Sequence, residues 1–196
     1  MTTPTYPYEA GAIILAGGSS RRMGQNKCLM KVNGVPMIQH IAQQLASRFS
    51  DCYISTNDPD TYSFLGLPAV ADEVPGKGPL MGIAAGMNHS PWDWNFFIAA
   101  DIPDPPLQLV DELYRHRDGH TAIVPLTTSG HYQPLFAFYH RSLLQPIQTA
   151  MASDQRHAHL VRELAQSYGV PIDDSLLKNI NTFHDYRALK NINRTE

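Results

Sequence analysis

The chain has 196 residues, of which 43% are hydrophobic and 17% are charged. This balance suits one globular domain with a sizeable core. The formal net charge of −3 gives no general attraction to nucleic acid or to anionic membranes. No stretch approaches the roughly 20 apolar residues of a membrane helix, and the first ten residues lack the pattern of a signal peptide. We therefore expect a cytoplasmic protein.

Short apolar runs alternate with amphipathic segments over the first 120 residues, which is the pattern of a parallel sheet covered by helices. The first eight residues are interpreted as a tail. The elements expected after it are strands at 12–16, 52–56, 69–71 and 95–100, and helices at 37–45, 80–87 and 107–114.

The pattern changes from residue 121. Two runs, 122–126 and 134–139, are expected to form strands, and the turn at Ser129-Gly130 between them is too short for a parallel crossover. This pair should therefore be antiparallel. Helices near 142–152 and 157–168, a short strand near 171–177 and a last helix from about residue 183 should follow. We predict an α/β fold, a Rossmann-like three-layer sandwich with a mostly parallel mixed sheet, in a single domain over residues 1–196.

The first predicted strand runs into a glycine-rich, basic loop, Leu15-Ala-Gly-Gly-Ser-Ser-Arg-Arg-Met-Gly-Gln-Asn-Lys27. Glycines at 17 and 18 let backbone amides turn toward a phosphate. Four of the fifteen Lys and Arg residues lie within eleven positions here, which favours an anionic partner such as a triphosphate. The glycine spacing fits neither the Walker A loop nor the dinucleotide G-x-G-x-x-G motif. A surface turn with solvated arginines is the alternative.

This loop resembles the signature L-A-G-G-x-S-x-R-M-G-x-x-K of molybdenum cofactor guanylyltransferases, which have the nucleotide-diphospho-sugar-transferase fold. The resemblance implies that the backbone from Leu15 through Ala16 and Gly17 to Gly18 holds the base and phosphates of GTP. It also implies that Arg22 and Lys27 contact the triphosphate. Asn26 stands where family members often have Asp. Cys28, beside Lys27, is either a reactive thiol or a buried filler.

Asp101 follows the clearest interior strand, in Ala100-Asp-Ile-Pro103. Open α/β sheets bind ligands at the carboxyl ends of their strands, and Mg²⁺ needs only one or two carboxylates beside phosphate oxygens. The alternative is a helix cap, for which Asp104 is better placed. In the family this position matches the Mg²⁺-binding Asp of a C-D-T-P-like motif. Asp101 is thus the expected metal ligand and, with Arg22 and Lys27, a catalytic residue.

Two further motifs resemble the same family. Asp72 and the turn Gly78-Pro-Leu-Met-Gly82 match D…P-G-x-x-G-P-L-x-G, in which the Asp helps to recognise guanine. The segment Asn179-Ile-Asn-Thr182 with Asp185 matches N-[IV]-N-T-x-x-[DE], in which the two asparagines, here Asn179 and Asn181, line the acceptor side. Alternatively, Thr182 and Asp185 cap the last helix.

The expected reaction transfers GMP from GTP to the terminal phosphate of molybdopterin, with Mg²⁺ and release of pyrophosphate. The partners implied are GTP, the molybdopterin-type cofactor and molybdoenzyme or cofactor-chaperone proteins. One alternative is a transferase that uses CTP or another acceptor, although Gly17 and the 78–82 turn favour GTP. Another is a non-catalytic nucleotide-binding or cofactor-delivery module. His157 and His159 are expected to be exposed and, if helical, to point to different faces.

Overall fold

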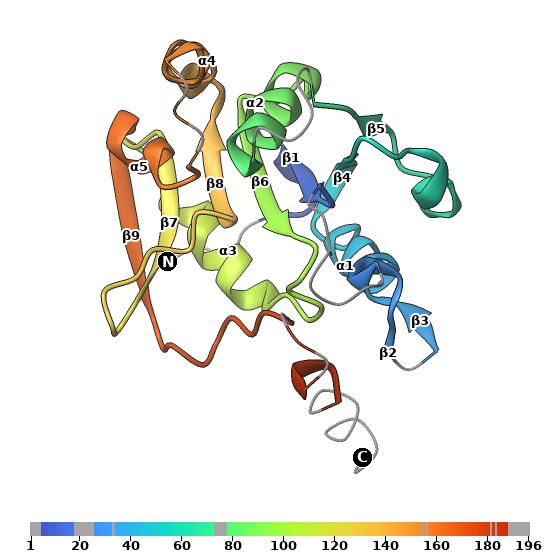
Figure 1. Cartoon of the computed structure of the whole chain (residues 1–196). Helices are drawn as coiled ribbons and strands as arrows, with labels where there is room; N and C mark the ends of the chain where they lie inside the picture. The colour runs from blue at the N-terminus through green and yellow to red at the C-terminus, as the bar shows by residue number, and fades with distance from the viewer. Residues whose placement is uncertain are drawn as a thin grey trace.

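The computed structural model describes residues 5–17, 26–32, 34–72, 78–153, 155, 157–180, 182 and 184–187. These residues form a sheet, a short two-stranded ribbon and helices on both sides of the sheet (Figure 1). The strands are β1 (Tyr8–Leu15), β2 (Lys31–Val32), β3 (Val35–Pro36), β4 (Phe49–Ser55), β5 (Ala69–Val70), β6 (Trp94–Ala99), β7 (Ala122–Thr127), β8 (Phe136–His140) and β9 (Ser167–Ile172). The helices are α1 (Met37–Leu45), α2 (Pro79–His89), α3 (Leu107–Arg115), α4 (Leu144–Ala152) and α5 (Leu160–Leu164), with 3₁₀ helices at Lys27–Leu29, Asp60–Leu65 and Arg141–Leu143.

The main sheet has the strand order β5-β4-β1-β6-β8-β7-β9. The pairs β4–β5, β1–β4, β1–β6 and β7–β9 are parallel, whereas β8 pairs antiparallel with both β6 and β7. The predicted mostly parallel, mixed α/β sheet is therefore confirmed. The antiparallel arrangement of β7 and β8, predicted from the short connection at 129–130, is confirmed as well.

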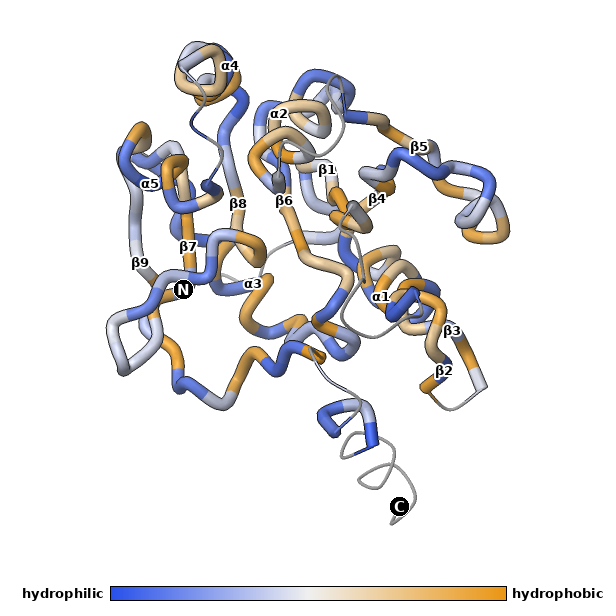
Figure 2. Tube along the Cα trace, in the orientation of Figure 1, coloured by the Kyte–Doolittle hydropathy of each residue, from blue (hydrophilic) through white to orange (hydrophobic). Residues whose placement is uncertain are grey.

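Helices cover the two faces of the sheet in separate groups. One buried cluster joins α1 and α3 to the sheet, through residues such as Ile41 and Val110, and a second joins α2, α4 and α5, through residues such as Ile83, Ile147 and Val161. Figure 1 shows α2 and α4 toward the top of the view and α1 and α3 lower, on the other side of the sheet. The apolar stretches of the trace follow the interior strands, as along β6 in Figure 2. The result is three layers, with the sheet between two sets of helices.

Several predicted boundaries are wrong. β1 begins at Tyr8, four residues before the predicted strand, and Tyr8 is only 1% exposed. The last residue of the expected tail is therefore part of the sheet, because its ring packs against Phe49 and Tyr114. The helix predicted at 157–168 is limited to α5, and β9 begins at Ser167, in place of the strand predicted near 171–177.

Among the described residues, no helix is both long enough and apolar enough to cross a bilayer.

Candidate active site

The carboxyl ends of three parallel strands meet around Leu15. Leu15 is in register with Ser55 on β4 and with Ala99 on β6. Beyond the strand, Ala16 N donates to Ser55 O at 2.9 Å and Ala100 N donates to Leu15 O at 3.1 Å. The loops that leave β1, β4 and β6 thus start side by side, at the edge where open α/β sheets bind ligands.

Lys27 and Asp101 form an ion pair at this edge. Lys27 Nζ lies 2.9 Å from Asp101 Oδ2, and the two side chains are 24% and 18% exposed. The other carboxylate oxygen, Oδ1, is buried and has no hydrogen-bond partner among the described residues. A buried acceptor without a donor is costly, so Oδ1 is suited to coordinate a cation. No group of three or more His, Cys, Asp or Glu gathers within the described ranges.

Lys27 is positioned by a local cap. It begins the 3₁₀ helix 27–29, and the side chain of Asn26 accepts a hydrogen bond from Cys28 N at 3.1 Å. Asn26 Nδ2 also donates to the Tyr62 hydroxyl at 2.9 Å, which a carboxylate at this position could not do. The amide thus joins the start of this 3₁₀ helix to Tyr62.

Cys28 is 5% exposed and packs in the core. Burial raises the pKa of its thiol, and this effect outweighs the hydrogen bond from Tyr62 and the charge of Lys27, which lower it. A thiol kept protonated in this way is a weak nucleophile. The buried-filler interpretation of Cys28 is therefore the one that the structure supports.

Asp72 is held by Asn57 through two hydrogen bonds. Asn57 Nδ2 donates to Asp72 Oδ2, and Asp72 N donates to Asn57 Oδ1, both at 3.0 Å. The pairing follows from the sheet, because Ser55 and Val70 are in register on β4 and β5 and each of the two residues lies two positions further on. Asp72 is half-buried, so its carboxylate is held in place while part of the side chain still faces solvent.

Gly78 and Gly82 shape the start of α2. Gly78 has φ 86° and ψ −179°, a backbone conformation that favours glycine, and Pro79 occupies the first helical turn. A Cβ on Gly82 would lie 2.8 Å from Ser55 Oγ, 3.0 Å from Leu15 Cδ2 and 3.7 Å from Asp72 Oδ1. The helix therefore approaches the ends of β1 and β4 more closely than a side chain at this position would allow.

A pocket of about 350 Å³ adjoins Asp101. The C-terminal segment forms part of its wall, since Asn179 lines it and Ile180 N donates to Asp101 O at 2.8 Å. Thr182 N donates to Asp185 Oδ2 and Asp185 N donates to Thr182 Oγ1. Residues 184–187 are helical, so the predicted helix cap by Thr182 and Asp185 is confirmed. Asn179 lies beside Asp101 in the same pocket. The other residues around the pocket are Pro79, Ala99, Ile102, Tyr132, Gln133, Pro134, Leu135, His157, Ala158 and His159.

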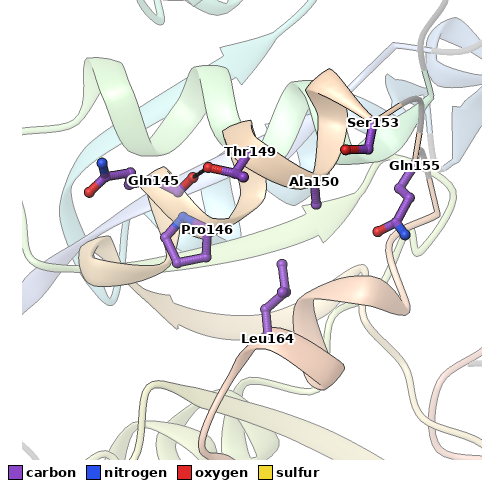
Figure 3. A pocket seen from close by; sticks show the side chains of 7 residues that line it. All are labelled: Gln145, Pro146, Thr149, Ala150, Ser153, Gln155 and Leu164. Carbon is purple, nitrogen blue, oxygen red and sulfur yellow. Dashed lines mark hydrogen bonds between the residues drawn. The ribbon is translucent and has the colours of Figure 1, made fainter.

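A second pocket of about 410 Å³ lies between α4 and α5 (Figure 3). The described residues around it carry no formal charge: Gln145, Pro146, Thr149, Ala150, Ser153, Gln155 and Leu164. Without cations it is poorly suited to a triphosphate, so the edge at Asp101 remains the candidate site.

The predicted site residues thus gather in two places. Lys27, Asp101 and Asn179 lie at one, whereas Leu15, Asp72 and Gly82 lie at the other, beside β1 and β4. Gly18, Arg22 and Asn181 lie outside the described residues. Asp104 does not cap α3 as expected, because the residue before this helix is Pro106, and Asp104 instead accepts a hydrogen bond from Gln44 at 3.1 Å.

Sequence reasoning missed Asn57, Gln133 and the place of the two histidines. His157 and His159 are exposed as predicted, but they precede α5, so helical spacing does not separate them, and both line the pocket at Asp101. Asn57 could have been found from its position just after the end of β4, because β4 is the neighbour of β1 and Gly17 follows β1.

A family model described as the MobA-like NTP transferase domain matches residues 12–168. Proteins named molybdenum cofactor guanylyltransferase from Vibrio cholerae and Serratia proteamaculans are each 32% identical to the chain. The alignments cover 92% and 90% of this chain, respectively, and 92% of each relative.

Solved structures show the same fold. Molybdopterin-guanine dinucleotide biosynthesis protein A from Archaeoglobus fulgidus has a TM-score of 0.80 at 22% identity, over 95% of this chain and all of its own. A 4-diphosphocytidyl-2C-methyl-D-erythritol synthase from Anaerococcus prevotii has a TM-score of 0.71 at 12% identity, over 94% of this chain and 98% of its own. With the family model spanning most of the chain and the relatives aligned over nearly all of it, the protein belongs to the MobA-like NTP transferase family.

Proposed function

We propose that this protein transfers GMP from GTP to the terminal phosphate of molybdopterin and releases pyrophosphate. The observation that carries the proposal is the Lys27–Asp101 pair in the loops that follow β1 and β6, with Asp72 held by Asn57 in the loops that follow β4 and β5. One end of this edge supplies a cation and a carboxylate for phosphates, and the other supplies a carboxylate for a base. The names of the relatives support guanine and molybdopterin as the two substrates.

Guanine recognition would fall to Asp72. Guanine presents two adjacent donors, N1–H and the 2-amino group, and a carboxylate can accept both at once. Asn57 restrains the carboxylate, which lowers the entropy lost on binding. Gly17 supports the same arrangement, since a Cβ there would meet no described atom within 4 Å and the space stays open for a ligand.

The triphosphate would lie between the first loop and Asp101. Lys27 carries a positive charge for the phosphate oxygens, and Arg22 would add a second. The buried Asp101 Oδ1 fits one coordination position of Mg²⁺, which takes oxygen ligands and keeps substrate phosphates and waters as the others. Mg²⁺ held there would supply charge neutralisation for the phosphates.

The chemistry needs no protein nucleophile. An oxygen of the acceptor phosphate forms a bond to the α-phosphorus of GTP, and the bond from that phosphorus to the oxygen bridging the α- and β-phosphates breaks. Pyrophosphate leaves with the electron pair. The chain contributes by positioning the two substrates and by stabilising negative charge on the leaving group, for which Lys27 is placed.

The test is pyrophosphate release from each of the four nucleoside triphosphates, with and without molybdopterin, in the presence and absence of Mg²⁺. We expect release only with GTP, molybdopterin and Mg²⁺ together. A preference for CTP would overturn the guanine assignment. Binding of GTP without any pyrophosphate would favour the alternative of a non-catalytic delivery module.

A further inference from the structure

Residues from distant parts of the chain line the pocket beside Asp101. Asp101 and Asn179 belong to the proposed site, and His157 and His159 come from the segment just before α5. Asp101 is the one formally charged side chain among the described residues around this pocket. The histidines thus bring nitrogen donors to a space in which the charged side chain among the described residues is a carboxylate.

The histidines are attached to a firmly packed base. Ala158 between them is 6% exposed and Val161, one turn further, is fully buried, so both anchor the segment in the core under α2 and α4. The guanidinium of Arg162 lies 4.3 Å from the centre of the Tyr132 ring and ties α5 to the loop that also forms the pocket. His157 and His159 flank this buried alanine in a turn, and both line the pocket.

An acceptor phosphate entering this pocket must approach a second phosphorylated molecule and the Asp101 carboxylate. Like charges at such short range repel one another strongly. Hydrogen-bond donors elsewhere in the pocket offset that cost, because N–H groups bound to an anion form charge-assisted hydrogen bonds. An imidazole always has at least one N–H to donate, and Gln133 beside it contributes an amide.

We propose that His157 and His159 bind the terminal phosphate of the acceptor, and that they hold it across the pocket from Asp101. The inference rests on the proposed function and deepens it, since it assigns residues to the acceptor. The two histidines are binding residues for the attacking group. The ligand class is a phosphate monoester whose remaining part lies against the apolar walls of Ile102 and Leu135.

The experiment compares the wild-type chain with the single and double variants of His157→Ala and His159→Ala. Equilibrium binding of molybdopterin without nucleotide gives a readout independent of turnover, and KM values for molybdopterin and GTP separate the two subsites. Because hydrogen bonds to charged groups are strong, the double variant should bind molybdopterin at least about tenfold more weakly. Its KM for GTP should stay within about twofold, since no contact to GTP is removed.

His131→Ala is the matched control, because His131 is an exposed histidine on the same loop as Tyr132 but outside the pocket. It should bind molybdopterin like the wild type. The double His→Gln variant retains amide donors at both positions and should recover part of the affinity, and it serves as the second variant if the alanines impair folding.

The outcomes are distinct. An active double variant with unchanged affinity for molybdopterin overturns the role of the histidines and leaves the proposed function standing. Equal weakening by His131→Ala overturns it as well. A wild-type chain that releases no pyrophosphate from GTP with molybdopterin overturns the proposed function itself.

Discussion

Lys27 and Asp101 are 74 residues apart in the sequence, yet Lys27 Nζ lies 2.9 Å from Asp101 Oδ2. The contact joins the loop after β1 to the loop after β6, which are neighbouring parallel strands. The second oxygen of Asp101 is buried and has no hydrogen-bond partner in the part of the chain that the structure describes. The pair is therefore only half of a site, and substrate phosphates with a cation would complete it.

Replacement of Asp101 by Asn tests this arrangement. The variant keeps the shape of the side chain but loses the negative charge that a divalent cation and Lys27 would both contact. We expect kcat/KM for pyrophosphate release to fall by at least about 100-fold, the scale of losing one electrostatic contact in a transition state. The pair is partly exposed, so the free energy of unfolding should change by no more than about 1 kcal/mol.

Asp104→Asn is the control for Asp101→Asn. Asp104 is exposed, lies three residues away and is bonded to Gln44, outside the pocket. It should retain the activity of the wild type. Near-normal pyrophosphate release by the Asp101 variant, with a normal thermal unfolding curve, would remove Asp101 from the mechanism.

Asp72→Asn should weaken the preference for guanine. The amide that replaces the carboxylate accepts through one oxygen only and presents donors toward the donors of guanine. Inosine triphosphate lacks the 2-amino group, so the ratio of kcat/KM for GTP to that for inosine triphosphate measures the second contact. We expect the variant to reduce this ratio by about tenfold.

Asn57→Ala should reduce the ratio of kcat/KM for GTP to that for inosine triphosphate by a smaller factor, because it frees the Asp72 carboxylate without removing it. Asp60→Asn, an exposed carboxylate on the same connection, should leave the ratio unchanged. If Asp72→Asn lowers activity with both nucleotides to the same degree, Asp72 does not read the 2-amino group.

Much of the fold was predictable because burial leaves a strong pattern. The segments that became β1 and β6 contain the apolar runs Ala12–Leu15 and Phe96–Ala99, which are typical of strands covered on both faces. β9 was misplaced because its sequence, Ser-Tyr-Gly-Val-Pro-Ile, contains a glycine and a proline. Both residues weaken a strand signal, and proline is accommodated here because β9 is at the edge of the sheet.

The candidate site was predictable only where a motif marks it. Lys27 and Asp101 each follow a recognisable strand, and parallel strands bring their loops together. Asn57 is different, since its contact with Asp72 depends on the register of β4 and β5, which a two-residue strand does not reveal in advance. His157 and His159 were assigned to a helix, and helical spacing then separated two side chains that the turn brings to one pocket.

Gly82→Ala should damage both stability and nucleotide binding. The added Cβ would lie 2.8 Å from Ser55 Oγ and 3.0 Å from Leu15 Cδ2, so both side chains must move. Overpacking of this kind costs about 1–3 kcal/mol, partly offset by the better helix propensity of alanine. Since Leu15 and Ser55 border the proposed base site, the KM for GTP should rise about fivefold.

Gly86→Ala is a matched control on the same helix, one turn further. Its Cβ would lie 2.9 Å from Phe97 Cε1 and 3.0 Å from Ile13 Cγ1, in the core away from the loops. It should lower the free energy of unfolding, measured with urea, by a similar amount, and leave the KM for GTP unchanged. A similar rise in KM in both variants would show that α2 acts through general stability alone.

Asp111 should make folding sensitive to acid. It is 8% exposed and accepts hydrogen bonds from the Tyr8 hydroxyl and from Arg48 Nε, the latter at 2.9 Å. Burial raises the pKa of Asp111, but the hydrogen bonds that it accepts and the positive charge of Arg48 together lower it by more than burial raises it. Its pKa in the folded state therefore lies below the usual value. The unfolded chain therefore binds the proton more readily, and this contribution to stability is present above about pH 4, the unfolded pKa. It is lost as the pH falls through the lower pKa of the folded state.

Asp111→Asn removes this dependence. Urea unfolding should show the variant less stable than the wild type at pH 7, because Arg48 loses its charged partner. The difference should narrow as the pH is lowered below about 4, where the carboxylate of the unfolded wild type becomes protonated. Tyr8→Phe, which removes one of the donors, should lie between the two at pH 7. A difference between wild type and Asp111→Asn that is the same at pH 3 and pH 7 would show that Asp111 stabilises the fold by packing rather than by its charge.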